Sequence, residues 1–373
     1  MKLFAALALC AVACSDTSTV VPDAGQDAAD QDTFVDPNTA YEHAVLNAEW
    51  QKLGTGPSAP AGAKQDDVFF LDANLGWAAN GPTSSIHKTT DGGATWNKVY
   101  THAGTYFRAL LFLDASHGFA GNIGAGLSGQ ITDTNVMYET TDGGTTWNPV
   151  TNITGPAPGG VCNFTAVDAT HIFAVGRANT PSFVLSSSDA GATWTSIDVT
   201  SKMMMLVDAR FTSPTDGILV GMNNSAVATV MATTDGAQTL TEVFTSKTMN
   251  SLVWKLSFPT NDVGYAAIQD ATTGPPSFAK TTDGGKTWTE MPLPQQANAK
   301  SPYPAIGIGF VTPNVGWVSP EDPALPTYVT TDGGNTWNVD PALKSPINRF
   351  RFVDQNTAYA IGGAVWKLSV AWP

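Results

Sequence analysis

The chain has 373 residues and a formal net charge of −14, with 18 Lys and Arg against 32 Asp and Glu. Only 13% of the residues are charged and 42% are apolar, which excludes an intrinsically disordered protein. Lys and Arg form no clusters, which argues against nucleic acid as a partner, because that binding depends on neutralising backbone phosphates. We therefore expect a folded protein with no nucleic-acid partner.

Residues 1–13 have the pattern of a secretory signal peptide. Lys2 precedes the apolar stretch LFAALALCAVA, which is too short to span a bilayer. The stretch ends in AVAC, which resembles the lipobox of bacterial lipoproteins and would make Cys14 the lipidated first residue of the mature protein. The alternative is cleavage after Ala13 without lipidation, since Ala11 stands where lipoboxes usually carry Leu. We expect an exported protein, anchored by lipid to the outer membrane or cell surface, or otherwise secreted.

Residues 14–43 are predicted to form an acidic tether behind the lipidated Cys14. Positions 15–40 contain six Asp and no Lys or Arg. Such a segment repels itself and lacks the apolar residues of a core, so it should stay extended. Contact with the membrane would occur through the lipid anchor only. Cys162 is left without a partner for an internal disulfide and is expected to be a small buried residue.

Six copies of an eight-residue motif close to TTDGGxTW follow the tether. Their aspartates recur at intervals of 46 to 51 residues, in the range typical of β-propeller blades. In each copy the Asp can accept backbone N–H bonds within a turn, the Gly supplies a positive φ, and the Trp returns to the sheet. The aspartates, to which we assign a structural role, are Asp91, Asp142, Asp189, Asp235, Asp283 and Asp332.

A second repeat occurs seven times upstream of the motif positions, as in FLDANLGWA and FVDQNTAYA. The last unit supplies only three strands, and EWQKL near the N-terminus aligns with TWNKV, so Trp50 takes the place of the missing motif Trp. Joining the two chain ends removes open sheet edges. We predict an all-β, seven-bladed β-propeller over residues 44–373, closed by an N-terminal strand. The fourth motif has Ala237 and Leu240 in place of Gly and Trp, so its blade should be distorted.

The motif resembles the Asp-box, or BNR, repeat of sialidases, sortilin-type receptors and some endoglucanase propellers. Together with the upstream repeat, the pattern DxxxGWA…TTDGGxTW is most similar to the photosystem II stability/assembly factor family. The resemblance covers nearly the whole mature chain and implies the propeller fold. It implies no single function, because function resides in sites built upon a fold.

One face of the predicted propeller is the candidate binding face. If strands a to d run outward in each blade, the b–c and d–a connections share a face opposite the a–b and motif turns. Their lengths vary widely, and binding residues concentrate in irregular loops. Neutral variation of exposed loops is the alternative, since insertions there cost little. The long segments are 122–135, 152–161, 292–304 and 319–326.

Polar residues on the inner strands form the candidate site. Strand alternation is expected to direct them toward a central channel, where Arg would suit a carboxylate or sulfate. The alternative is a set of mutual ion pairs, Asp208 with Lys255 and Arg349 with Asp67. The candidate binding residues on the channel and variable face are Arg108, Asn163, Arg210, Trp254, Lys255, Arg349 and Arg351.

No catalytic residue, metal site or cofactor is predicted. Glycoside hydrolysis usually needs two carboxyl groups ~5–10 Å apart, and the inner strands offer only Asp66, Asp67 and Asp208. The five His have no ligand spacing, and the Gly-rich turns precede no helix. The favoured hypothesis is a monomeric, non-catalytic protein that binds a protein or glycan partner at the cell envelope. The alternatives are a glycoside hydrolase acting on extracellular glycans and an assembly factor for an envelope complex.

Overall fold

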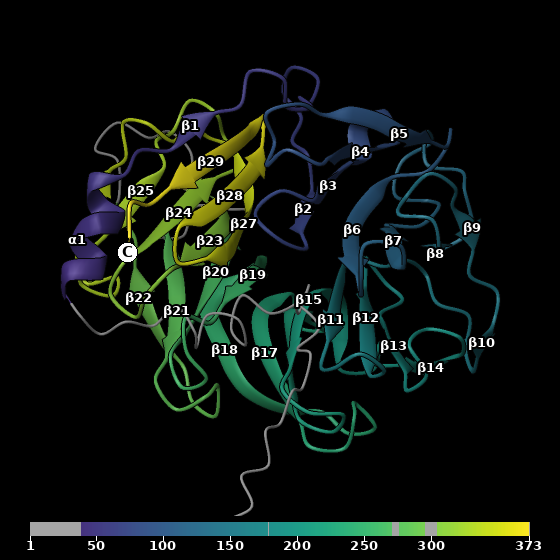
Figure 1. Cartoon of the computed structure of the whole chain (residues 1–373). Helices are drawn as coiled ribbons and strands as arrows, with labels where there is room; N and C mark the ends of the chain where they lie inside the picture. Colours follow the sequence, from purple (N-terminus) through teal and green to yellow (C-terminus); the bar gives the residue numbers. More distant parts are fainter. Residues whose placement is uncertain (1–38, 178, 271–275, 295–303, 373) are drawn as a thin grey trace, which may run out of the picture.

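The computed structural model describes residues 39–177, 179–270, 276–294 and 304–372. Seven mainly antiparallel sheets surround a common axis (Figure 1), which confirms the predicted seven-bladed β-propeller. The predicted signal peptide, Cys14 and most of the tether lie outside the described residues, as does most of 292–304. Among the helices of the described stretches, none has the length and apolarity needed to cross a membrane.

Each blade runs outward from an inner strand beside the axis. Blade 1 has β2 (Asp67–Phe70), β3 (Gly76–Asn80), β4 (Ser85–Thr89) and β5 (Asn97–Thr101). Blade 2 has β6 (Phe107–Phe112), β7 (Gly118–Asn122), β8 (Met137–Thr140) and β9 (Asn148–Pro149). Blade 3 has β11 (Asn163–Ala166), β12 (Ile172–Gly176), β13 (Phe183–Ser187) and β14 (Trp194–Asp198), with β10 (Ile153–Thr154) added parallel to β14. A short 3-10 helix over Gly81–Thr83 joins β3 to β4.

The remaining blades follow the same order. Blade 4 has β15 (Met203–Phe211), β16 (Gly217–Asn223), β17 (Val227–Thr233) and β18 (Thr241–Met249). Blade 5 has β19 (Ser251–Ser257), β20 (Gly264–Asp270), β21 (Ser277–Thr281) and β22 (Thr289–Pro292). Blade 6 has β23 (Ala305–Phe310), β24 (Gly316–Pro320), β25 (Tyr328–Thr330) and β26 (Asn338–Val339). Blade 7 has β27 (Ile347–Asp354), β28 (Thr357–Gly362), β29 (Val365–Ser369) and β1 (Gln51–Lys52).

The N-terminal strand closes the ring as predicted. Strand β1 pairs antiparallel with β29, and Gln51 lies opposite Lys367. Trp50 is buried and contacts Trp317 and Phe350 edge-on, with ring centroids 5.5 and 5.8 Å apart. Blade 7 is therefore built from both ends of the chain, and β1 covers the edge that β29 would otherwise leave open.

A helix that the sequence analysis did not predict precedes β1. Helix α1 (Thr39–Asn47) begins inside the segment expected to be an extended tether. Tyr41 and Val45, four residues apart on one face, are buried with blades 6 and 7. Tyr41 Oη donates to Gln355 O, and Glu42 accepts a bond from Thr312 Oγ1 at 2.7 Å. Since Thr312 and Gln355 belong to a–b turns, α1 docks on the face formed by those turns.

The repeated motif forms the same hydrogen-bonded turn in every copy. In blade 1, Asp91 accepts bonds from Thr95 N at 2.8 Å and Thr95 Oγ1 at 2.6 Å, while Thr89 Oγ1 accepts from Gly93 N. The expected distortion of blade 4 is absent from its turn. Ala237 takes the positive φ of 71° and donates to Thr233 Oγ1 at 2.9 Å, and Leu240 is buried.

Neighbouring blades pack through a repeated aromatic contact. In four of the seven blades an aromatic residue near the start of the b strand lies against the next blade, where it stacks on the Phe that ends that blade's inner strand. Trp77 stacks on Phe112, and Tyr265 stacks on Phe310, with centroids 3.5 and 3.4 Å apart. Phe173 on Phe211 and Tyr359 on Phe70 repeat this geometry at 3.6 Å. These stacks hold one blade to the next around the ring.

Candidate functional site

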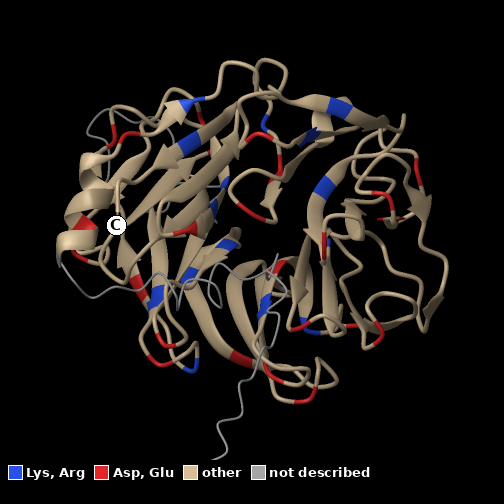
Figure 2. Cartoon of the chain, in the orientation of Figure 1, with Lys and Arg blue, Asp and Glu red and all other residues tan. Residues whose placement is uncertain are grey.

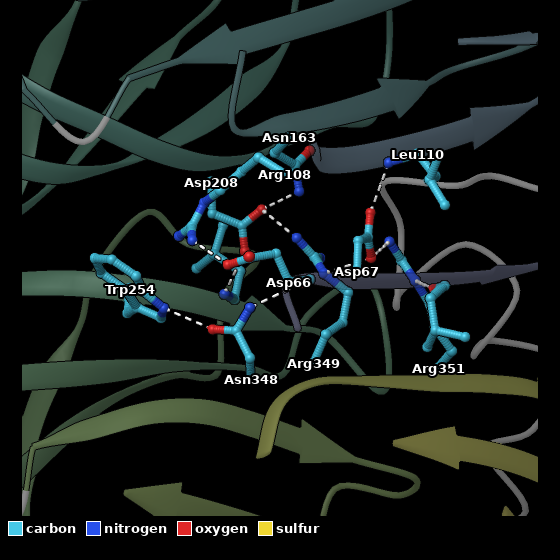
Figure 3. Close-up of polar contacts among 12 residues, drawn as sticks. Asp66, Asp67, Arg108, Leu110, Asn163, Asp208, Trp254, Asn348, Arg349 and Arg351 are labelled. Atoms are coloured by element: carbon cyan, nitrogen blue, oxygen red, sulfur yellow. Dashed lines mark hydrogen bonds and ion pairs between the residues drawn. The ribbon is translucent and has the colours of Figure 1, made fainter. Parts of the chain in front are cut away.

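Eleven residues around the axis form a buried polar group, which we call the axial cluster (Figure 3). Nine of them come from inner strands, and the other two come from the connection that precedes β2. The cluster consists of Lys64, Asp66, Asp67, Arg108, Asn163, Asp208, Trp254, Lys255, Asn348, Arg349 and Arg351. It includes six of the seven predicted binding residues.

β-Bulges bring several of these side chains to the axis. In five inner strands the pairing register with the neighbouring strand shifts near the start of the strand. The residue left unpaired is Arg108 in β6, Trp254 in β19 and Asn348 in β27. A bulged residue is unpaired and its side chain is re-aimed. The predicted strict alternation therefore fails at these positions, and the sequence analysis did not identify Asn348. A signal was present, since all three stand four residues before the Phe of the upstream repeat.

Asp67 joins blade 7 to blade 1. Its Oδ1 lies 3.0 Å from Arg349 Nε and 3.2 Å from Arg351 Nη2, while its Oδ2 accepts a bond from Leu110 N at 2.8 Å. Arg351 Nε also donates to Val68 O at 2.9 Å. The inner edge of a propeller leaves backbone groups without a strand partner, and these side chains satisfy them. The expected Arg349–Asp67 pair is present.

Asp208 has different partners from those expected. No hydrogen bond or ion pair joins it to Lys255 within the described chain. Its carboxylate instead accepts bonds from Asn163 Nδ2 and from Leu256 N at 3.0 Å, and it lies 3.9 Å from Arg349 Nη2. Asp208 thus caps the inner edge of blade 5 as Asp67 caps that of blade 2.

Arg108 is held by Asp66 and Trp254 but keeps unused donors. Its Nη1 bonds to Asp66 Oδ1, and its guanidinium lies 4.8 Å from the Trp254 ring, which Lys64 also approaches at 5.2 Å. Within the described residues its Nε and Nη2 have no hydrogen-bond partner, although Arg108 is only 3% exposed. Burial opposes its charge, yet Asp66 raises the pKa of Arg108, so the guanidinium stays charged. Unused charged donors of this kind suit an anionic ligand.

Lys255 adds a second cation without a direct counter-ion. It is 2% exposed, and no described residue forms a hydrogen bond or ion pair with its ammonium. Burial, reinforced by the nearby Arg349, lowers the pKa of Lys255 to about 7, although Asp208 acts in the opposite direction. The positive charge of the axial cluster therefore increases as the pH falls through neutrality.

The axial cluster is cationic in a chain that is acidic overall. Its five Lys and Arg face three Asp. Figure 2 shows basic residues on inner strands near the axis, whereas many acidic residues lie in the turns. A cavity of about 370 Å³ lies next to the cluster on the face of the b–c and d–a connections. Lys64 is shared by cavity and cluster, and Tyr106 and Glu321 line the same cavity.

Arg210 is the predicted binding residue that lies apart from the cluster. It is buried toward the a–b turns, where its Nη2 donates to Asn261 Oδ1 at 2.5 Å and its guanidinium lies 4.6 Å from the Phe258 ring. The long segments 122–135 and 152–161 do lie together on the variable face, because Arg177 Nη1 donates to both Ala125 O and Gly159 O. Cys162 is buried and unpaired as expected. Within the described stretches no group of His, Cys, Asp and Glu is arranged to hold a metal.

The ring of seven sheets, six with four strands and one with five, is closed by strands from both ends of the described chain and defines a seven-bladed β-propeller. No protein-family model matches the sequence, and no curated protein matches it. Solved structures do resemble it. One titled "YCF48 bound to D1 peptide" has 18% identity and a TM-score of 0.60, and covers 87% of this chain and 97% of its own.

Two further structures support the same fold. YCF48 from Cyanidioschyzon merolae has 16% identity and a TM-score of 0.62, and covers 86% of this chain and 99% of its own. The GH74 xyloglucanase from Xanthomonas campestris has 14% identity and a TM-score of 0.61, and covers 86% of this chain but 53% of its own. At these identities the likeness shows the fold alone, which is the predicted β-propeller.

Proposed function

We propose that this propeller is a non-catalytic binding protein that takes up an acidic segment of a partner protein at the axial cluster. The observation that carries the proposal is Arg108, a buried and charged guanidinium whose Nε and Nη2 have no partner among the described residues. Lys255 adds a second cation that lacks a direct counter-ion. A carboxylate reaching the cluster through the neighbouring cavity would gain charge-assisted hydrogen bonds in a desolvated setting.

A protein partner is favoured over a glycan for two reasons. The excess positive charge of the axial cluster favours an anionic ligand. Protein side chains and C-termini carry negative charges, whereas neutral polysaccharides do not. The similar YCF48 structure is described as bound to a D1 peptide. An assembly role for an envelope complex would be one use of such peptide binding.

The geometry supports binding rather than glycoside hydrolysis. Asp67 is held by Arg349, Arg351 and Leu110 N, while Asp208 is held by Asn163 and Leu256 N. A hydrolase needs one carboxyl group kept protonated as the acid and a second one free to act. These carboxylates are instead occupied in holding blades together.

Arg108→Gln should weaken binding of a fluorescein-labelled heptaglutamate peptide about ten-fold or more, because hydrogen bonds to charged groups contribute ~1.5–3 kcal/mol. Fluorescence anisotropy at low salt measures the affinity, and a heptaglutamine peptide tests the need for charge. Arg177→Gln is the matched control, since Arg177 binds loop carbonyls away from the cluster. Equal affinity of the wild-type protein and Arg108→Gln would refute the proposal.

The same titration should depend on pH. Lys255 is protonated below its pKa of about 7 and neutral above it, so heptaglutamate should bind more tightly at pH 6 than at pH 8. The peptide carboxylates stay ionised across this range. In Lys255→Met the difference in heptaglutamate affinity between pH 6 and pH 8 should shrink. An unchanged difference would mean that another group causes the pH dependence.

We further propose that a lipid on Cys14 holds the propeller at the cell envelope as a monomer. The docking of α1 against the a–b turns of blades 6 and 7 supports a fixed orientation, because the chain then enters on the face opposite the axial cavity. Cys14→Ser should move the protein from the membrane fraction to the soluble fraction and abolish labelling by a fatty-acid analogue. Membrane association that survives this substitution would contradict the anchor.

A further inference from the structure

Blade 4 breaks the aromatic pattern that joins the other blades. At the second position of each b strand the residue lies opposite a c-strand residue, and the pair packs toward the next blade. The seven pairs are Trp77 with Lys88, Phe119 with Glu139, Phe173 with Ser186, Ile218 with Ala232, Tyr265 with Lys280, Trp317 with Val329, and Tyr359 with Lys367. Six of them contain an aromatic ring, and blade 4 alone has Ile and Ala.

A cavity of about 300 Å³ lies where the missing side chains would stand. It opens between blades 4 and 5 on the face of the a–b and motif turns. Ile218 and Ala232 line its floor, Arg210 lies on one side, and Gly284 and Lys286 of the blade 5 motif lie on another. It is therefore distant from the axial cavity on the opposite face.

Arg210 partly replaces the missing ring. Phe258 directly follows the inner strand of blade 5 and has no stacked ring from blade 4, but the Arg210 guanidinium lies 4.6 Å from its centroid. Asn261 Oδ1 accepts a bond from Arg210 Nη2 and fixes the planar group against Phe258. A guanidinium plane accepts an aromatic ring on its face and an anion at its edge.

We propose that this blade 4–5 cavity is a binding site for a small planar aromatic ring that carries one carboxylate. The ring would occupy the volume that Trp, Tyr or Phe fills elsewhere in the propeller, against Ile218 and Ala232 and beside Arg210. Ile218 and Ala232 supply the apolar part of a lining that also contains Arg210, Lys286 and three Thr. The exposed Lys286 at the rim supplies the charge for the carboxylate. The rim carboxylate Asp216 is already engaged by Ser213 Oγ and Thr215 Oγ1.

The other blades show how to close the cavity. In blades 5 and 7 the b-strand residue is Tyr and the c-strand residue opposite it is Lys. Each Lys donates to the carbonyl of the first Gly in the motif of the following blade, as Lys280 does to Gly333 O at 2.9 Å. The double substitution Ile218→Tyr with Ala232→Lys installs that pair in blade 4. Ala232→Lys alone is a second variant, because Ala232 is partly exposed and tolerates a longer side chain.

Binding of 4-fluorobenzoate, followed by fluorine NMR line broadening on the full chain, tests the proposal. The wild-type protein should bind with a Kd on the order of 1 mM, as expected for a ligand of about ten heavy atoms. Fluorobenzene, which lacks the carboxylate, should bind at least several-fold more weakly. Both filling variants should lose 4-fluorobenzoate binding, while Arg108→Gln in the axial cluster should keep it.

The following outcomes would contradict the proposed binding site. Absence of binding to the wild-type protein, or equal binding to both filling variants, would overturn the proposal. Fluorobenzene binding as tightly as 4-fluorobenzoate would overturn the requirement for an anion. Because Arg108→Gln is tested in parallel, failure of this site and failure of the axial site are distinguishable.

Discussion

Asp67→Asn is expected to destabilise the propeller by about 3–5 kcal/mol, the usual cost of removing one partner from a buried ion pair. Asp67 is 1% exposed and is the carboxylate that both Arg349 and Arg351 contact. The substitution keeps the shape of the side chain but leaves two buried guanidinium groups facing a neutral amide. Urea unfolding followed by tryptophan fluorescence measures the change in the free energy of unfolding.

Asp262→Asn is the matched control for Asp67→Asn. Asp262 is exposed in the a–b turn of blade 5, and its backbone carbonyl accepts a bond from Gly284 N, while its carboxylate has no hydrogen bond to another described residue. The same chemical change there should alter stability by less than about 0.5 kcal/mol. If the two variants unfold at the same urea concentration, the seam between blades 7 and 1 does not depend on Asp67.

Trp50→Ala should cost about 3–5 kcal/mol, as large-to-small substitutions of buried Trp do. Trp50 packs against Trp317 and Phe350, and it positions β1 beside β29. Loss of that anchor should release β1 and expose the edge of β29 to pairing with a second molecule. Thermal unfolding should report the lost stability, and sedimentation should show self-association that increases with protein concentration.

Trp337→Ala separates loss of packing from loss of ring closure. Trp337 is a half-buried motif Trp of blade 6, where all strands are contiguous in sequence, and it contacts Phe278 and Phe310 edge-on. This variant should be less stable than the wild-type protein but should remain monomeric. Amide exchange at Leu53, whose N–H donates to the Val365 carbonyl, should accelerate in Trp50→Ala and not in Trp337→Ala. Acceleration in both variants would mean that general destabilisation, not opening of the ring, explains the effect.

The fold could be predicted from the sequence because its signals are local and repeated. Each motif turn is built from residues within eight positions, so Asp91 and its equivalents make the same bonds wherever they occur. Even the fourth copy keeps this turn, since Ala237 adopts the positive φ that Gly would otherwise supply. The closing strand was predictable for the same reason, as Trp50 occupies a repeat position.

The candidate site was only partly predictable because it depends on contacts between blades. The pairing of Arg349 with Asp67 follows from their equivalent positions in adjacent blades. The pairing of Asp208 with Lys255 was wrong, because the backbone N–H of Leu256 and the amide of Asn163 occupy the Asp208 carboxylate. Bulges further changed which residues face the axis, and the burial of Tyr41 and Val45 in α1 depends on blades 6 and 7 far along the chain.

Blade 7, which is built from both ends of the chain, also determines the order in which the propeller can be completed. Gln51 finds its partner Lys367 more than 300 residues later in the chain. At a synthesis rate of ~5–20 residues per second, β1 waits roughly 15–60 s for the strand that it must join. Blades 1 to 6 can pair their strands as they emerge, but the ring stays open until the last strand arrives. The seam between blades 7 and 1 is therefore the final step of folding, and an unfinished chain carries an unclosed ring.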